Sequence, residues 1–323
     1  MTRWLITGGA GYIGAHVADA MLASGRDVTV LDDLSTGRPE FTPEGARTVV
    51  GSILDRGALA DALADADGVV HLAGYKYAGE SVRRPLHTWR QNVSGTIELL
   101  DAMREHGVAR IVFSSSAGVY GTPDVDRVTE ATPPEPESPY GESKLAGELL
   151  LADERRRAAL EHEPFQAVAL RYFNVIGSAT DRIRDVSPYN LVPAVLAMLA
   201  RGERPQINGD DYPTPDGTCV RDWVHVGDVA LAHVAAAERM ERGLALEPAY
   251  NLGSGEGASV RQVLAAIGRA LGHDLDPRIA PRRPGDPARI VADGALAERD
   301  LGWRMRHGLD AMVASAVRAA QTA

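Results

Sequence analysis

A tyrosine and a lysine four residues apart, Tyr140 and Lys144 in the segment SPYGESK, are the residues best suited to chemistry. Four-residue spacing places two side chains on the same face of a helix. An ammonium group favours the phenolate form of a neighbouring tyrosine, so we expect the pKa of Tyr140 to lie below its usual value of about 10. Such a tyrosine can move protons near neutral pH. A solvated surface pair has the same spacing, so other motifs must distinguish the two interpretations.

Three glycines, Gly8, Gly11 and Gly14 in TGGAGYIG, lie between a strand-like segment and a helical one. Glycines at such a junction permit a tight turn and the close approach of a pyrophosphate, which the helix N-terminus then binds. A tight turn without a ligand is the alternative. The position at the first strand–helix junction of an alternating chain favours a dinucleotide site.

The acid Asp32 ends the second strand-like segment, at about the spacing from the glycines that a ribose-binding carboxylate requires. A carboxylate there accepts hydrogen bonds from both ribose hydroxyls and repels a 2′-phosphate. This predicts NAD rather than NADP as the cofactor. Asp33 is a second candidate for the role, and a helix N-cap is the alternative interpretation of Asp32.

The elements that position these residues alternate between strands and helices. Strand-like segments cover 3–7, 27–32, 48–51, 68–74, 109–117 and 167–173, and helical patterns cover 12–25, 55–66, 80–107 with an interruption near Pro85, and the Tyr140 helix capped by Ser138. Alternation of this kind predicts an α/β fold with a Rossmann-type doubly wound parallel sheet. After about residue 175 the elements are shorter, which predicts a second, smaller mixed α/β domain. We expect an NAD-binding domain over 1–174 and a substrate domain over 175–323, with interleaved boundaries.

Composition limits the partners. The 323 residues carry a net charge of −10, which argues against a nucleic-acid or anionic-membrane surface. We find no apolar run long enough to span a bilayer. The single cysteine, Cys219, excludes an intrachain disulfide and indicates a cytoplasmic protein, and we expect its side chain to be small and buried rather than nucleophilic. The nine histidines are scattered without an i, i+4 ligand pair, so we predict no metal site.

Longer motifs add a resemblance. The segments GGAGYIGAH (8–16), LAGYKYAGESVRRPL (72–86), FSSSAGVYG (113–121), LRYFN (170–174), GDDYPTPDGTCVRDWVHVGDVA (209–230) and YNLGSGEGASV (250–260) join the motifs already described. Together they resemble the UDP-glucose (UDP-galactose) 4-epimerase family of the extended short-chain dehydrogenase/reductase superfamily, over essentially the whole chain.

The resemblance implies roles for particular residues. Tyr140 matches the catalytic acid and base, Lys144 its electrostatic partner and a ligand of the nicotinamide ribose, and Ser116 a hydrogen-bond partner of the sugar 4-oxygen. The positions that match cofactor contacts are Gly8, Gly11, Tyr12, Ile13, Gly14, Asp32, Asp33, Ser52, Ile53, Leu72, Ala73, Lys76, Asn92, Ser114, Tyr140, Lys144 and Tyr172. The positions that match substrate contacts are Ser116, Tyr140, Asn174, Asn190, Leu191, Asn208, Arg221, Arg283 and Asp286. Two separated arginines suit a diphosphate, which takes bidentate donors.

The chain departs from the family pattern in four places. Ser52 replaces an acid that meets the adenine, and the segment 174–190 is shorter than the equivalent loop. The segment YKY (75–77) carries two tyrosines where smaller or aliphatic residues are common. Ile290 stands where the family varies a side chain that limits sugar size, so we expect N-acetylated sugars to be accepted beside UDP-glucose and UDP-galactose.

The implied reaction is NAD-dependent 4-epimerisation of a UDP-hexose through a 4-keto intermediate. Sugar 4,6-dehydratases carry an additional acid pair after the strand-end hydroxyl residue, where this chain has Ala117 and Gly118. The main alternative is an epimerase or dehydrogenase for a different nucleotide sugar in specialised metabolism. A non-enzymatic dinucleotide sensor is a third hypothesis, which the retention of Tyr140, Lys144 and Ser116 disfavours. The resemblance also implies a homodimer formed by the 80–107 stretch and the Tyr140 helix.

Overall fold

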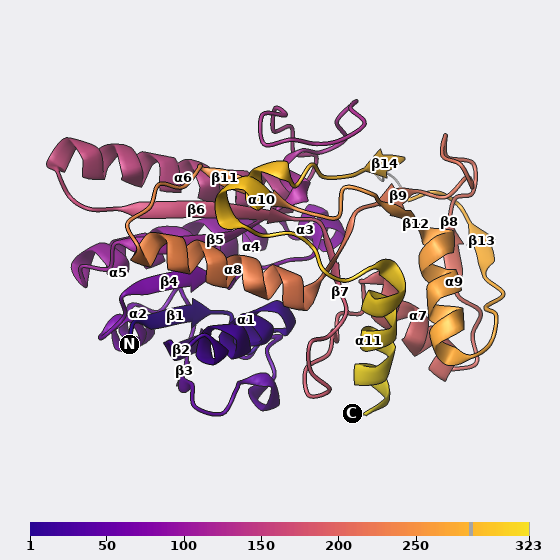
Figure 1. Cartoon of the computed structure of the whole chain (residues 1–323), viewed down its shortest axis with the longest axis horizontal. Helices are drawn as coiled ribbons and strands as arrows, with labels where there is room; N and C mark the ends of the chain where they lie inside the picture. The colour runs from indigo at the N-terminus through magenta and orange to yellow at the C-terminus, as the bar shows by residue number, and fades with distance from the viewer. Residues whose placement is uncertain (284–286, 323) are drawn as a thin grey trace.

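A twisted parallel sheet with helices on both faces forms the larger part of the molecule, and a smaller group of short strands and helices lies at one end (Figure 1). The computed structural model describes residues 1–283 and 287–322. In the part of the chain that it describes, no helix is long and apolar enough to cross a membrane.

The sheet has seven strands in the order β11-β6-β5-β4-β1-β2-β3. Its strands are β1 (Arg3–Thr7), β2 (Asp27–Asp32), β3 (Arg47–Val50), β4 (Gly68–His71), β5 (Arg110–Ser116), β6 (Gln166–Tyr172) and β11 (Ala249–Leu252), and every neighbouring pair is parallel. The inner strands are buried on both faces because helices cover both, which explains their apolar runs without alternation. The predicted Rossmann-type sheet is confirmed.

Two hydrophobic clusters join the helices to the two faces of this sheet. On one face α1 (Tyr12–Ala23) and α8 (Val226–Glu241) pack side by side, through residues that include Val17 and Val229. On the other face lie α2 (Arg56–Leu63), α5 (Gly95–Glu105) and α6 (Pro139–Glu161), with Leu59, Leu99 and Leu151 in the core.

The predicted helical stretch 80–107 is interrupted near Pro85, as expected. It forms α3 (Ala78–Arg83), α4 (Pro85–Trp89), a π-helical turn (Arg90–Ser94) and then α5. Pro85 begins α4, where its missing N–H breaks no helical hydrogen bond. The π-helical turn carries Asn92, and such turns are frequent at functional sites.

Among the described residues, the smaller part has three short sheets and three helices around a separate core. The paired strands are β7 (Asn174–Ile176) with β10 (Trp223–His225), β9 (Val220–Arg221) with β12 (Ala258–Ser259) and β14 (Arg289–Ile290), and β8 (Gln206–Asn208) with β13 (Arg278–Ala280). The helices are α7 (Leu191–Ala200), α9 (Val260–Leu271) and α11 (Leu309–Gln321), whose cluster includes Val195, Ile267 and Val313.

The chain passes between the two parts more than once. After β10 it returns to the large sheet as α8 and β11, and later as α10 (Ala295–Leu301), which packs against β11 (Figure 1). A single boundary therefore does not separate the two parts, and the division into 1–174 and 175–323 stays a prediction.

Candidate active site

The carboxyl ends of β1, β4 and β5 meet at one edge of the sheet, where the predicted cofactor and catalytic residues lie. Open α/β sheets bind ligands at this edge, at the point where the strand order reverses. Here the reversal lies between β1 and β4. The segments after these strands meet, because the backbone N–H of Ala73 donates to the Thr7 hydroxyl at 3.2 Å.

The turn between β1 and α1 admits only glycine at two positions. Gly8 has φ 72°, and a Cβ on it would lie 2.8 Å from the backbone nitrogen of Ala73. A Cβ on Gly14 would collide with the carbonyl oxygen of Gly8. No side chain caps the start of α1 at Gly11, so its first N–H groups are available to an anion. This turn fits the pyrophosphate of a dinucleotide.

The carboxylate of Asp32 faces this turn. Its Oδ2 accepts from the Ala10 backbone at 3.0 Å, and its Oδ1 accepts from the Leu34 backbone at 2.9 Å. The side chain is buried, and burial raises the pKa of Asp32 above its usual value. Asp33 is exposed and binds the Ser35 backbone at 2.9 Å. Asp32 is therefore the better placed of the two acids for a ribose.

Replacing Asp32 by Ser is expected to weaken NAD binding by roughly 10- to 100-fold, the value of hydrogen bonds to a charged group, and to relax discrimination against NADP. Asp33→Ser is the matched control, because Asp33 is the neighbouring exposed acid. The measurement is titration of each variant with both nucleotides, together with the identity of nucleotide released on denaturation. Tighter NADP than NAD binding in the parent protein would contradict the assignment.

The remaining cofactor positions lie around this edge with different exposure. Ile53 is buried, whereas Ser52 accepts from the Leu54 backbone at 3.2 Å and so serves its own loop. Asn92 is buried, and joins the Tyr75 backbone at 2.6 Å to the Ser143 hydroxyl at 2.8 Å. Three further positions are Leu72, which is partly buried, Lys76, which is exposed, and Tyr12, whose hydroxyl donates to the Gly177 carbonyl at 2.5 Å.

Helix α6 presents Tyr140 in its first turn. Ser138 caps the helix as predicted, accepting from the Gly141 backbone at 3.2 Å. The Tyr140 backbone N–H donates to the Ser81 hydroxyl of α3 at 3.1 Å, and the Tyr140 hydroxyl is hydrogen-bonded to Ser116. Ser116 ends β5, so the phenol is held between a helix start and a strand end.

Lys144 lies one turn further along α6 and is buried. Its Nζ donates to the carbonyl of Ser114 at 2.9 Å and lies 6.0 Å from the centre of the Tyr140 ring. The hydroxyl of Ser114 contacts His233 Nε2 at 3.0 Å and is also hydrogen-bonded to Tyr172. The structure thus brings Tyr140 and Lys144 together, as the spacing predicted, and places Ser116, which the resemblance implied, beside them.

The expected lowering of the Tyr140 pKa is wrong for this structure. Burial raises the pKa of Tyr140, and the hydrogen bond from Ser116 offsets only part of that effect. Lys144 is directed at the strand carbonyl rather than at the phenol. Burial likewise lowers the pKa of Lys144 to about 8, which the Glu148 carboxylate opposes. The four-residue spacing predicted that Tyr140 and Lys144 lie close together, but it did not predict that both side chains are buried.

The dehydratase acids have no counterpart beside Tyr140. A Cβ on Gly118 would lie 3.4 Å from the Ser116 hydroxyl and 3.6 Å from the Tyr140 ring. An acidic side chain at position 118 would therefore point at the reacting centre, where glycine offers no proton donor.

The predicted substrate residues come from the smaller part of the molecule. Asn174 Nδ2 donates to the Asp222 carbonyl at 3.2 Å, and Arg221 Nη1 donates to the Pro287 carbonyl at 2.7 Å. The Asn208 amide lies within 3.3 Å of the Arg283 guanidinium, so these two candidates are brought together. Three further positions are Asn190, bound to Asp185 at 2.6 Å, Leu191 at the start of α7, and Asp286, which lies outside the described residues.

Two of the departures from the family pattern contact each other. The Tyr77 ring lies 5.5 Å from the Tyr75 ring and 4.9 Å from the Tyr189 ring, both in edge-on geometry. Tyr77 is also hydrogen-bonded to Ser187 of the shortened segment. Aromatic contacts of this geometry stabilise by about 0.5–1.5 kcal/mol each. Ile290 is buried in a cluster with Tyr120 and Phe173, and its effect on sugar size stays a prediction.

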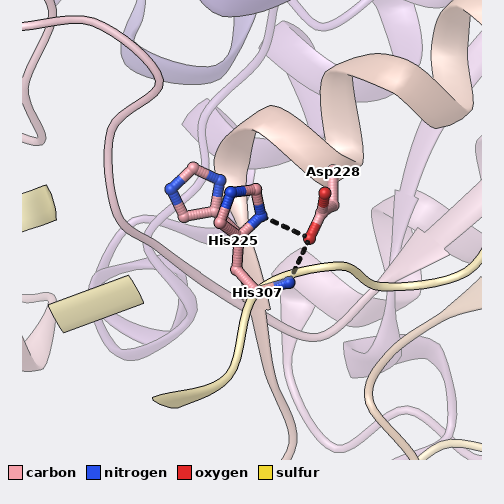
Figure 2. A group of neighbouring side chains, drawn as sticks. All are labelled: His225, Asp228 and His307. Atoms are coloured by element: carbon pink, nitrogen blue, oxygen red, sulfur yellow. Dashed lines mark hydrogen bonds and ion pairs between the residues drawn. The ribbon is translucent and has the colours of Figure 1, made fainter. Parts of the chain in front are cut away.

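Sequence analysis missed a junction between α8 and the segment before α11, because its members lie far apart in the chain. Figure 2 shows Asp228 Oδ2 accepting from His307 Nδ1 at 3.0 Å and from the His307 backbone at 3.2 Å. The rings of His225 and His307 stack 4.0 Å apart, and one possible ligand atom from each of His225, Asp228 and His307 lies within 4.8 Å of the others. His225 Nδ1 accepts from Gly227 at 3.1 Å, and its Nε2 faces Ser315 Oγ at 3.2 Å. These contacts join α8 to the segment before α11, and the expectation of no metal site stays a prediction.

Three comparisons with known proteins agree on the family. The model of the NAD dependent epimerase/dehydratase family matches residues 4–253. The chain therefore belongs to this family of nucleotide-binding enzymes.

Within that family, the chain is similar to UDP-glucose 4-epimerases. The enzyme of Corynebacterium glutamicum is 42% identical, over 94% of this chain and 91% of its own. A crystal structure of UDP-glucose 4-epimerase from Stenotrophomonas maltophila, with NAD and formylated UDP-arabinopyranose, superposes with a TM-score of 0.91 at 38% identity, covering 99% of this chain and 98% of that one. The Bifidobacterium longum enzyme with NAD+ and UDP gives 0.89 at 35% identity, covering 99% and 98%.

Proposed function

We propose that this protein is a UDP-hexose 4-epimerase that interconverts UDP-galactose and UDP-glucose with tightly bound NAD. The observation that carries the proposal is the contact of Tyr140 with Ser116 beside a buried Lys144, with glycine at position 118. This set can move one proton and hold one oxygen, and has no second acid for elimination. The glycine turn and Asp32 fit NAD.

Tyr140 is the acid and base in this proposal. Its phenolate takes the proton of the sugar 4-hydroxyl while bound NAD supplies the acceptor, and later the donor, of the C4 hydride. The Ser116 hydroxyl, held by the Gly118 N–H at 3.1 Å, is placed to bind the same sugar oxygen. Burial raises the pKa of Tyr140, and we propose that the positive charge of Lys144, 6.0 Å from the centre of the ring, favours the phenolate against that effect during the reaction.

The substrate contacts are assigned to the smaller part of the chain. Arg221 and Arg283 are proposed for the diphosphate, with Asn174, Asn190, Leu191 and Asn208 around the sugar and the base. Inversion requires that the 4-keto sugar turn about its diphosphate, so that C4 presents its other face. The protein must therefore bind the nucleotide end of the substrate firmly while it leaves the sugar end free to turn.

The test is incubation of purified protein with UDP-galactose and trace NAD, followed by separation of the sugars. We expect UDP-glucose to form without net reduction of NAD. No UDP-glucose, or NADH rising in step with a keto or acid product, would overturn the proposal.

A different nucleotide sugar is the second candidate, favoured by the contact of Tyr75, Tyr77 and Tyr189 beside the predicted site. These rings connect the 75–77 loop to the segment before α7. A panel of UDP- and dTDP-sugars, including UDP-GalNAc for the Ile290 expectation, distinguishes the candidates by kcat/KM.

The protein is further proposed to be a cytoplasmic homodimer. Large apolar side chains are exposed on neighbouring helices, namely Val82 of α3, Leu86 of α4, Ile97 of α5 and Leu149 of α6. Helices α3 and α4 both pack against α6. An exposed apolar group of this kind is typical of an interface.

Leu86→Glu is expected to raise the dissociation constant of the dimer by roughly 30-fold or more, because charge at an interface core costs about 2 kcal/mol or more. Light scattering after size-exclusion chromatography measures the mass over a dilution series. Leu160→Glu, at the far end of α6, is the matched control, since Leu160 is equally exposed. A monomeric parent protein would contradict the proposal.

A further inference from the structure

Three side chains lie along one face of α6 at four-residue intervals: Tyr140, Lys144 and Glu148. The first two belong to the proposed proton transfer. Glu148 takes no part in that transfer, yet only 11% of its side chain is exposed. A carboxylate buried to that degree needs partners to offset its desolvation.

Glu148 has partners on two strands. Its Oε1 accepts from the Ser115 hydroxyl at 2.5 Å and from Arg171 Nε at 2.9 Å, and its Oε2 accepts from Arg171 Nη2 at 2.5 Å. This is the bidentate arrangement that makes an arginine–carboxylate pair strong and directional. Arg171 Nη1 also donates to the Tyr120 hydroxyl at 2.8 Å, so both ends of the pair are fixed.

Ser115 connects this pair to the reacting groups. It lies between Ser114, whose carbonyl accepts from Lys144, and Ser116, whose side chain is hydrogen-bonded to Tyr140. Successive side chains of a strand point to opposite faces, and the Ser115 hydroxyl accordingly contacts Glu148 of α6 while the Ser114 hydroxyl contacts His233 of α8. A hydrogen bond at Ser115 therefore holds the strand end on which both other contacts depend.

The charges around Lys144 come from α6, β4, β6 and α8. The Glu148 carboxylate raises the pKa of Lys144 against the effect of burial, and Tyr140 is the acidic group on its other side. His71 of β4 and His233 of α8 are neutral at neutral pH, because burial lowers their pKa values to about 3 and about 4. Arg171 and Tyr172 come from β6, and Arg171 is already paired with Glu148.

We propose that Glu148 is a positioning residue, which holds the serine end of β5 against α6 and keeps a negative charge one helical turn from Lys144. Its effect on the reaction rests on the proposed function. Its effect on Lys144 does not, and can be measured without substrate.

The chain offers an unusual means of measurement, because it contains only two lysines, Lys76 and Lys144. Lysine labelled with 13C at Cε gives one signal for each in the NMR spectrum, and titration yields both pKa values in the holoprotein. Exposed Lys76 is the internal reference. The variant is Glu148→Gln, which keeps the shape of the side chain and removes its charge.

The matched control is Glu241→Gln. Glu241 pairs with Arg26 at 2.6 Å, with 18% and 9% of the two side chains exposed, near the amino ends of β1 and β2. Both variants remove a charge from a buried arginine pair, but only one pair adjoins Lys144. A purely structural role predicts the same outcome for both.

In Glu148→Gln we expect a lower pKa for Lys144, an unchanged value for Lys76, and kcat lower by about tenfold, the factor to which a pKa change of one corresponds. The alkaline limb of the kcat profile should move to lower pH. Glu241→Gln should change the melting temperature but neither the pKa of Lys144 nor the kcat profile. An unchanged Lys144 pKa in Glu148→Gln, or the same change in both variants, would overturn the proposal.

Ser115→Ala tests the positioning part and guards against a Glu148 variant that fails to fold. It removes one hydrogen bond from Glu148 and leaves the arginine pair intact. We expect kcat to fall several-fold while KM and the melting temperature stay near those of the parent protein. A kcat equal to that of the parent would show that the strand end needs no support from Glu148.

Discussion

Replacing Tyr140 by Phe is expected to lower kcat by a factor on the order of 10²–10⁴, the usual contribution of a positioned acid–base group. The change removes one oxygen and leaves the ring in the first turn of α6. The Tyr140 backbone bond to Ser81 does not depend on the side chain, so the helix start should persist. The loss should therefore appear in turnover, measured with UDP-galactose at saturation, and not in the melting temperature.

Tyr77→Phe is the matched control for this variant. It removes a phenol hydroxyl that binds Ser187 outside the Tyr140, Lys144 and Ser116 set. Turnover in Tyr140→Phe within a few-fold of the parent, with bound NAD retained, would refute the role of Tyr140. Equal losses in both variants would show that any phenol near the site matters.

Lys144→Met is expected to lower kcat by roughly 10²–10³, the range for removal of one preorganised electrostatic group. Met fills the volume of the stem, but cannot offset the burial that raises the pKa of Tyr140. Binding of NAD should also weaken. The measurement is a kcat comparison together with the NAD content of the purified variant.

The same residue sets a pH dependence. Burial lowers the pKa of Lys144 to about 8, so its charge is present below that pH and is lost as the pH rises through it. Loss of the ammonium removes the group that favours the phenolate, so kcat should fall on the alkaline side. Lys144→Arg, which stays charged, should lose that limb while being slower, whereas Lys76→Met should keep it. An alkaline limb that survives in Lys144→Arg would assign it to another group.

Local patterns predicted much of this molecule. The alternation of apolar strands and helical segments predicted the parallel sheet, since each strand buried on both faces needs covering helices. The glycine turn and Asp32 lie together, as their spacing predicted. The proximity of Tyr140 and Lys144 was predictable because residues four apart lie on the same face of a helix. That rule depends on no other part of the chain.

Contacts between distant segments were not predictable in this way. The raised pKa of Tyr140 results from burial of the phenol in the folded chain, which spacing within α6 does not report. Tyr77 contacts Tyr189 of the shortened segment 174–190, although the two residues lie far apart in the chain. Glu148 follows Lys144 by the same four-residue step that separates Lys144 from Tyr140, and lysine occurs in this chain only as Lys76 and Lys144, so the sequence itself carries a signal for each.

The position of β11 has a consequence for synthesis on the ribosome. This strand covers the edge of β6, but its residues 249–252 are made well after β6 ends at Tyr172. At 5–20 residues per second, the interval lasts roughly 4–15 s. Throughout it, the nascent sheet has an unpaired and largely apolar edge, which is the kind of surface that pairs with other chains. In nascent chains that end before β11, the edge of β6 stays exposed. We therefore expect such chains to depend on chaperones.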